Sequence, residues 1–184
     1  MIWFTSDLHF CHNREFLFKP RGFDNIDDMN NAIVERWNNV VDEYDEVYIL
    51  GDLMLNDNAK GEDLIRSLNG RLHIILGNHD TDNRVEIYKS IPSVDEILYA
   101  TMLKYGNLHF FLTHYPCLTG NLEKEYLSQM TLNLFGHTHS KELFFEDRPY
   151  MYNVSLDAHD CTPVNIETVK VDMLAKIHEC KAML

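Results

Sequence analysis

Five short apolar segments of this chain each end in side chains that can bind a metal ion. The clearest segment runs from Leu72 to Leu76, is broken only by His73, and is followed by Gly77-Asn78-His79-Asp80. An apolar run of this length predicts a buried strand, and ligands bind at the carboxyl ends of such strands in open α/β sheets. Asn78 offers an amide oxygen to a hard cation, and His79 can donate or accept a proton. Alone, this motif is also typical of an ordinary turn.

Four other apolar segments repeat the design. They run from Met1 to Thr5, Glu46 to Leu50, Leu108 to Thr113 and Thr131 to Phe135, and they lead into Ser6-Asp7-Leu8-His9, Gly51-Asp52, His114 and Gly136-His137-Thr138-His139, respectively. Residues i and i+2 share one face of an extended chain, so each Asp-x-His or His-x-His pair can converge on one point. We therefore expect the five strand ends to meet at one site.

The side chains at these strand ends predict divalent cations. The candidate ligands are Asp7, His9, Asp52, Asn78, His114, His137 and His139. Imidazole together with carboxylate suits manganese, iron, zinc, cobalt or nickel better than calcium. Seven ligands are too many for one tetrahedral zinc, and they suit two divalent metal ions about 3.5–4 Å apart that share one carboxylate.

The intervening segments predict an α/β fold. Helices are expected to begin after Asp24 or Asn25, with an apolar stripe from Ile26 to Val41, and to span Gly61 to Leu68, Val85 to Ile91, Leu122 to Leu127 and Glu167 to Lys181. Further strands are expected at Val94 to Tyr105, Leu143 to Phe145, Met151 to Val154 and Val164 to Ile166. This order predicts a four-layer α-β-β-α sandwich, in which two mixed β-sheets pack face to face with helices outside. Residues 1–184 are expected to form a single domain.

Composition narrows the function and the compartment. The net charge of −13 disfavours a surface that coats extended nucleic acid. No segment approaches the roughly 20 apolar residues of a membrane helix, and the N-terminus does not resemble a signal peptide. The four cysteines lie far apart, which predicts reduced thiols in a cytoplasmic protein. No feature of the sequence predicts an oligomeric state.

The five motifs, in this order, resemble those of the calcineurin-like metallophosphoesterases. The resemblance covers the chain from Ile2 to about His139 and, more loosely, the segment from Asn153 to Pro163. The first motif continues as His9-Phe10-Cys11-His12, which resembles a short bacterial and phage branch. The resemblance implies one metal held by Asp7, His9, Asp52 and His139, and another held by Asp52, Asn78, His114 and His137. It also implies that His79 is catalytic and that Asp80 orients it.

The implied activity is metal-dependent phosphoric ester hydrolysis. A hydroxide that bridges the two metals would attack the ester, and His79 would protonate the departing oxygen. Manganese is the leading candidate metal. Gly51-Asp52 is followed by no arginine up to Asp57, unlike the protein phosphatases of the superfamily, which favours a small phosphoester substrate. The lack of a fixed arginine pair for a dianion favours a diester or nucleotide. The alternatives are a catalytically silent metal-binding scaffold and a nuclease.

Several other polar and aromatic residues have two interpretations. His12 either contacts substrate or caps a turn, and Arg14, Arg21, Arg84 and Arg148 either bind phosphate or lie in solvent, the solvated state being favoured. Asp157 and His159 are expected to be turn residues, and His73, His109 and His178 to be structural. The aromatic residues Phe16, Phe18, Phe23 and Trp37 are expected in the core rather than at a base-stacking surface.

Overall fold

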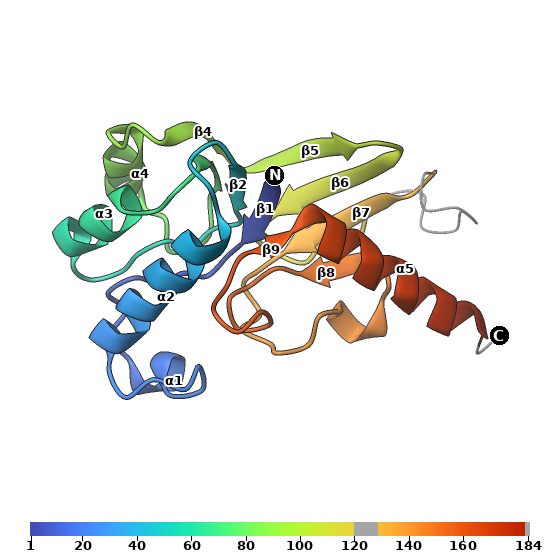
Figure 1. Ribbon diagram of the computed structural model, residues 1–184, viewed down its shortest axis with the longest axis horizontal. Coiled ribbons are helices and arrows are strands. Elements are labelled where there is room, and N and C mark those ends of the chain that lie inside the picture. Colours follow the sequence, from blue (N-terminus) through green and yellow to red (C-terminus); the bar gives the residue numbers. More distant parts are fainter. Residues whose placement is uncertain (120–128, 183–184) are drawn as a thin grey trace.

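The computed structural model describes residues 1–119 and 129–182 and contains two β-sheets with helices (Figure 1). The first sheet has the strand order β4-β3-β2-β1-β9. Its strands are β1 (Ile2–Thr5), β2 (Glu46–Ile49), β3 (Arg71–Ile75), β4 (Val94–Leu98) and β9 (Val164–Asn165). Strands β1 to β4 pair in parallel, and β9 is antiparallel to β1. The parallel arrangement places the carboxyl ends of β1, β2 and β3 at one edge.

The second sheet has the order β5-β6-β7-β8. Its strands are β5 (Ala100–Tyr105), β6 (Leu108–Thr113), β7 (Thr131–Phe135) and β8 (Met151–Asn153). Strands β5 and β6 form the expected antiparallel hairpin, whereas β6, β7 and β8 pair in parallel. Both sheets are therefore mixed, and the predicted α/β architecture with two mixed sheets and helices is confirmed.

Helices cover the first sheet on the side away from the second sheet (Figure 1). These helices are α1 (Glu15–Phe18), α2 (Ile26–Val40), α3 (Asn58–Arg66) and α4 (Asp82–Lys89), while the remaining helix, α5 (Ile166–Ala182), packs elsewhere. Asn25 caps α2, because its side-chain oxygen accepts a hydrogen bond from the backbone N–H of Asp28 at 2.9 Å. The fully buried Trp37 of α2 packs beneath this layer and donates its indole N–H to the carbonyl of Asn69 at 2.9 Å.

Alternation along the central strands divides the core in two. Val47 and Ile49 of β2 pack with the helices, while Leu50 packs in the core that the two sheets share. The shared core includes Phe4 of β1 and Phe110 of β6, whose ring centroids lie 6.4 Å apart. Helix α5 packs into this second core through Ile166, Val169 and Met173. The two sheets are thus fixed against each other by apolar side chains, and this packing positions the strand ends.

Two segments differ from their predicted structure. Residues 94–105 form two strands rather than one, because the chain bends at Tyr99 and passes from the first sheet to the second. Apolar alternation does not reveal which partner a strand pairs with, so this change of sheet was not visible in the sequence. Residues 143–145 form no regular strand: Phe144 makes an isolated bridge with Tyr152, and a 3-10 turn, η2 (Phe145–Asp147), follows. The predicted helix from Leu122 to Leu127 lies outside the described residues.

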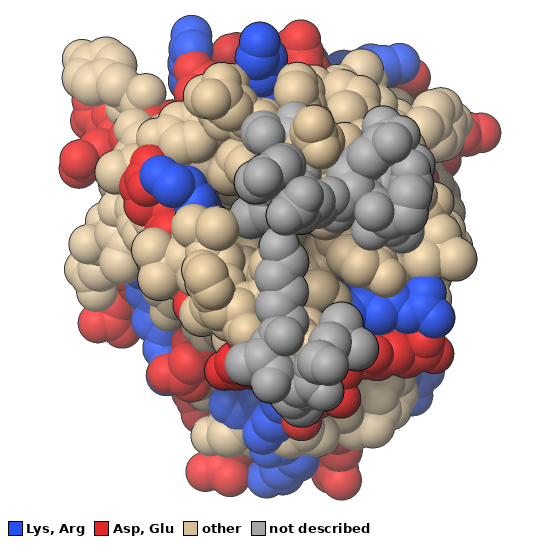
Figure 2. Space-filling view, turned by 90° about the vertical axis from the view of Figure 1, so that its right-hand side faces the viewer, with Lys and Arg blue, Asp and Glu red and all other residues tan. Residues whose placement is uncertain are grey.

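The surface carries charges of both signs. On the face shown in Figure 2, Lys and Arg side chains are scattered among Asp and Glu side chains, without a continuous basic area. Within residues 1–119 and 129–182, no helix has both the length and the apolar character needed to cross a membrane. The four cysteines, all in the described part of the chain, are free thiols.

Candidate active site and metal centre

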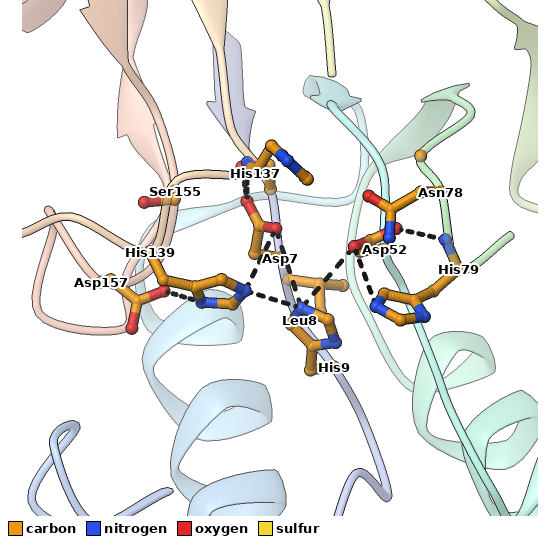
Figure 3. A network of polar contacts seen from close by, with 12 residues as sticks. Asp7, Leu8, His9, Asp52, Asn78, His79, His137, His139, Ser155 and Asp157 are labelled. Atoms are coloured by element: carbon orange, nitrogen blue, oxygen red, sulfur yellow. Dashed lines mark hydrogen bonds and ion pairs between the residues drawn. The ribbon is translucent and has the colours of Figure 1, made fainter. Parts of the chain in front are cut away.

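The loops after β1, β2 and β3 meet the loops after β6 and β7 at one edge of the two sheets (Figure 3). Backbone hydrogen bonds join these loops directly. The N–H of Asp7 donates to the carbonyl of Gly51 at 2.9 Å, and the N–H of His9 donates to the carbonyl of Asp52 at 3.0 Å. In the second sheet, the N–H of Gly136 donates to the carbonyl of His114 at 2.9 Å. The five strand ends therefore form one continuous surface, as the motif order predicted.

Most of the candidate ligands have a strained backbone. Five of the seven have positive φ angles: Asp7 (58°), His9 (50°), Asp52 (59°), His137 (69°) and His139 (49°). The left-handed region disfavours residues with a Cβ atom, and each such conformation costs on the order of 1–3 kcal/mol. Such strain persists only where the surrounding structure enforces it, and it concentrates at functional sites. Here it aims several side chains at one point.

Glycines in the motifs allow the loops to approach closely. A Cβ atom on Gly77 would collide with Oδ1 of Asp52 and lie 2.9 Å from Cε1 of His114. A Cβ atom on Gly136 would collide with the side chain of Ser6 and lie 2.5 Å from Oδ2 of Asp7. These two glycines are required because the acidic side chains occupy the space that any larger residue would need.

One group of candidate ligands consists of Asp7, His9 and His139. Nε2 of His9 lies 3.1 Å from Nε2 of His139, and these atoms lie 3.7 and 3.8 Å from Oδ1 of Asp7 (Figure 3). Asp7 is completely buried, yet its Oδ1 has no hydrogen-bond partner. An unpartnered buried carboxylate oxygen is costly, and a cation would satisfy it together with the two imidazole nitrogens. The residues present thus fit a divalent metal.

A second group contains Asp52, Asn78, His114 and His137. Nε2 of His114 lies 3.0 Å from Oδ1 of Asn78, 3.2 Å from Nδ1 of His137 and 3.6 Å from Oδ2 of Asp52. Nδ1 of His114 lies 2.7 Å from the carbonyl of Leu50, which fixes the proton on Nδ1 and leaves the Nε2 lone pair directed into the site. The donor set of this group also fits a divalent cation.

Electrostatics prepare the ligands for metal binding. Burial would raise the pKa of Asp7, but the neighbouring His9 imidazole lowers it to about 2, so the carboxylate is ionised. Burial lowers the pKa of His9 and of His137, which favours the neutral imidazoles that metals require. Burial raises the pKa of Asp52, and a bound cation would act in the opposite direction.

Asp157 and Arg21 support the first group from outside, and the sequence did not predict either contact. Nδ1 of His139 donates to Oδ2 of Asp157 at 2.9 Å, and Arg21 donates to both oxygens of Asp157 at 2.9 and 2.7 Å. Arg21 also donates to the carbonyl of Asp7 at 2.8 Å. The Arg21 side chain is only 1% exposed, so the expected solvated state is wrong, and Asp157 is more than a turn residue.

These contacts shift the titration of the supporting groups. Burial would raise the pKa of Asp157, but the hydrogen bond from Arg21 lowers it well below its usual range. Burial would lower the pKa of His139, but the Asp157 carboxylate raises it. The only sequence signal for this region was a loose resemblance between residues 153 and 163 and the same family branch.

Asp80 differs from its expected position. Its carboxylate accepts hydrogen bonds from the backbone N–H groups of Asp52 and Gly77 at 2.8 and 2.9 Å, and from the hydroxyl of Tyr88 at 2.8 Å. Among the described residues, no hydrogen bond joins Asp80 to the ring of His79. Asp80 therefore ties the β2 loop to the β3 loop. The expectation that its carboxylate orients the His79 imidazole is wrong.

His79 lies beside the second group with its ring open to solvent. Its side chain is 41% exposed, and Nε2 lies 4.0 Å from Oδ2 of Asp52. The backbone N–H of His79 donates to Oδ1 of Asp52 at 2.9 Å, and its carbonyl accepts a hydrogen bond from Arg84 at 2.5 Å. Arg84 is thus a structural contact of the His79 loop rather than a solvated residue. The ring can reach a molecule that enters the site.

A cavity of about 400 Å³ opens at the two ligand groups. Its lining residues are His9, His12, Arg14, Phe16, Leu17, Asp52, Asn78, His79, His137 and His139. A volume of this size lies within the usual range for small-molecule sites, roughly 300–1,000 Å³.

Phe18 and Trp37 are buried as expected and Phe23 packs against the core, but Phe16 is 71% exposed, so its predicted core position is wrong.

Other histidines and acids lie apart from the cavity. Nε2 of the half-buried His159 donates to the carbonyl of Asn153 at 2.8 Å, which is a structural contact. A further cluster joins Glu46, His73 and Asp95, but Arg71 already forms ion pairs with both acids of that cluster. The guanidinium of Arg71 therefore offsets the negative charge of Glu46 and Asp95.

Comparison with known proteins agrees with this geometry. A profile of the calcineurin-like phosphoesterase superfamily domain matches residues 1–154. The chain belongs to the calcineurin-like phosphoesterase superfamily. An uncharacterized protein of Methanocaldococcus jannaschii is 31% identical over 189 residues, covering 97% of this chain and 91% of that protein. The gene 66 protein of Mycobacterium phage D29 is 30% identical over 190 residues, covering 89% of this chain and 92% of that protein. The phage relative is consistent with the predicted branch.

Similarity in three dimensions supports the same fold. The crystal structure of a protein of unknown function from Aquifex aeolicus superposes with a TM-score of 0.72 at 23% sequence identity, covering 92% of this chain and 97% of that chain. Membership of the superfamily makes this calcineurin-like protein a metal-dependent phosphoric ester hydrolase that uses divalent metal ions.

Proposed function

We propose that this calcineurin-like enzyme hydrolyses a small phosphoester at a centre of two divalent cations. Asp7, His9, Asp52 and His139 would hold one cation, and Asp52, Asn78, His114 and His137 would hold the other. The observation that carries the proposal is the position of Asp52: its Oδ2 lies 3.7 Å from Nε2 of His9 and 3.6 Å from Nε2 of His114. One carboxylate oxygen thus faces both ligand groups, as a bridging ligand must.

The chain's own residues supply binding and proton transfer. When bound, two divalent cations lower the pKa of a shared water and offset the charge that builds on phosphate oxygens. His79 would act as the general acid, because its exposed ring lies next to Asp52 and opens into the cavity. A positioned imidazole that protonates the departing oxygen contributes about 10²–10⁴-fold to the rate.

The ligand chemistry favours transition metals over magnesium or calcium. Four imidazoles, two carboxylates and one amide oxygen suit manganese, iron, zinc, nickel or cobalt, and we propose manganese first. The free thiols fit a reducing compartment such as the cytoplasm. We further propose that the chain is a single domain, since the two sheets share one core.

The substrate that fits best is a small diester or nucleotide. The cavity accommodates a small molecule, and the net charge of −13 opposes extended nucleic acid. Among the described residues that line the cavity, Arg14 is the one Lys or Arg side chain, so these residues offer no arginine pair to bind a dianion.

A metal-by-substrate panel tests the proposal. Protein stripped with a chelator would be reloaded with manganese, nickel, cobalt, iron, zinc or magnesium, and each form would be assayed on mono-, di- and cyclic phosphoesters. We expect turnover that depends on a transition metal, with bis-p-nitrophenyl phosphate cleaved faster than p-nitrophenyl phosphate. No turnover with any combination would indicate a silent scaffold, and a strong monoester preference would reverse the substrate assignment.

A further inference from the structure

Phe16 occupies an unusual position in the short helix α1. The two residues that follow it in the helix, Leu17 and Phe18, are buried, whereas the Phe16 side chain points outward and is 71% exposed. Single exposed apolar residues are common on protein surfaces, so exposure alone carries no functional meaning. What distinguishes Phe16 is that it lines the cavity of the metal centre.

Aromatic rings connect Phe16 to the centre of the site. The ring of Phe16 meets the ring of His12 edge to face, with centroids 5.8 Å apart and an interplanar angle of 87°. The ring of His12 lies 5.2 Å from that of His9 and 6.2 Å from that of His79. The cavity lining therefore combines imidazole nitrogens and the Asp52 carboxylate with the exposed apolar ring of Phe16. A ligand that satisfies both parts needs a phosphate and a planar ring.

We propose that Phe16, supported by His12, is a stacking surface for the nucleobase of a nucleotide substrate. The location of the phosphate rests on the proposed function, whereas the stacking contact rests on the exposed ring and the shape of the cavity. Arg14 lies in the same lining and places a positive charge near the phosphate in a chain that is otherwise strongly acidic. His12 lines the same cavity. Of its two interpretations, contact with the substrate is therefore favoured over capping of a turn.

The size of the effect can be stated in advance. Stacking of one base on an aromatic side chain changes affinity by roughly 5- to 150-fold. Stacking uses the flat face of a base and not the hydrogen-bonding groups at its edge. The preference for a ligand with a base over one without should therefore extend to every nucleobase. Removing the ring should therefore weaken binding of a nucleoside ligand without affecting a ligand that has only a sugar.

Two non-hydrolysable ligands that differ only in the base provide the test. The 5′-phosphonate analogues of adenosine monophosphate and of ribose 5-phosphate would be titrated calorimetrically into manganese-loaded protein. We expect the adenosine ligand to bind about tenfold tighter or more to the wild-type protein. Phe16→Ala should remove this preference, Phe16→Trp should retain it, and Tyr44→Ala should leave it unchanged, because Tyr44 is an 88% exposed aromatic outside the cavity lining.

The possible failures are distinguishable. Equal affinity of the two phosphonates for the wild-type protein, or a preference that survives Phe16→Ala, would overturn the stacking surface and leave the metal centre intact. Failure of manganese-loaded protein to bind either phosphonate would overturn the stacking proposal, whereas the metal-by-substrate panel decides separately whether the metal centre hydrolyses phosphoesters. Because Phe16 is exposed, its substitution should not disturb folding, and circular dichroism of each variant would verify this.

Discussion

Nε2 of His9 lies 3.1 Å from Nε2 of His139, although 130 residues separate them along the chain. Each histidine follows a strand of a different sheet, β1 or β7, and each has a positive φ angle. The apolar core between the sheets brings the two strand ends together, and the strained loops turn both imidazoles toward Asp7. The fold thus brings Asp7, His9 and His139 into an arrangement that suits a bound cation.

Replacing the shared carboxylate should empty both metal positions. Asp52→Ala removes the oxygen that lies 3.7 Å from His9 and 3.6 Å from His114, so we expect the metal content to fall from about two ions per chain toward zero. Elemental analysis of dialysed protein measures this. Asp95→Ala, in the separate Glu46 and His73 cluster, is the matched control and should keep both metals. An Asp52→Ala protein with two ions per chain would contradict the bridge.

Loss of the proposed general acid should depend on the leaving group. His79→Ala should retain both metals, because no proposed ligand is removed. Its kcat should fall about 10²–10⁴-fold on an alkyl ester but much less on a p-nitrophenyl ester, whose departing oxygen needs no proton. Steady-state kinetics on the two esters compare these effects. Equal losses on both substrates would remove His79 from this role.

The Arg21 and Asp157 pair should control metal affinity through His139. Asp157→Asn weakens the hydrogen bond that orients the His139 ring, and loss of such a supporting contact typically lowers metal affinity 10–100-fold. Competition with a fluorescent chelator measures the dissociation constants. Asp160→Asn is a suitable control, because Asp160 lies three residues away with an exposed side chain. Unchanged affinity in Asp157→Asn would show that Asp157 only braces Arg21.

Acid should destabilise the metal-free protein partly through His159. Burial lowers the pKa of His159 in the folded state, so its contribution to stability is present above the unfolded pKa near 6.5 and is lost as the pH falls further. The loss is at most about 1.4 kcal/mol for each pH unit. Urea unfolding in a chelator at pH 7.5 and 5.5 should show a smaller drop for His159→Gln than for wild type. An equal drop in the two proteins would exclude this contribution.

The convergence of the candidate ligands was predictable from the sequence because its signal is local. Each candidate ligand directly follows an apolar strand, and parallel pairing places those strand ends at one edge whatever the rest of the chain does. The same pattern places a glycine directly before Asp52, Asn78 and His137. The existence of most strands followed from the same periodicity, whereas the assignment of strands to the two sheets did not.

Contacts between distant loops were not predictable in this way. Arg21 precedes Asp157 by 136 residues, and neither lies at the end of a predicted strand, so no pattern connected them. The change of sheet at Tyr99 and the outward direction of Phe16 depend on which neighbours cover each side chain, which alternation alone does not specify. Asp80 was assigned to His79 by adjacency in the chain, whereas its carboxylate turns back to the loops beneath it.

The most direct test of the two-metal centre is a crystal structure of manganese-loaded protein with an anomalous difference map. The account predicts two peaks about 3.5–4 Å apart on either side of the Asp52 carboxylate, one next to Asp7, His9 and His139 and the other next to Asn78, His114 and His137. A single peak, or peaks only at Glu46 and His73, would contradict it.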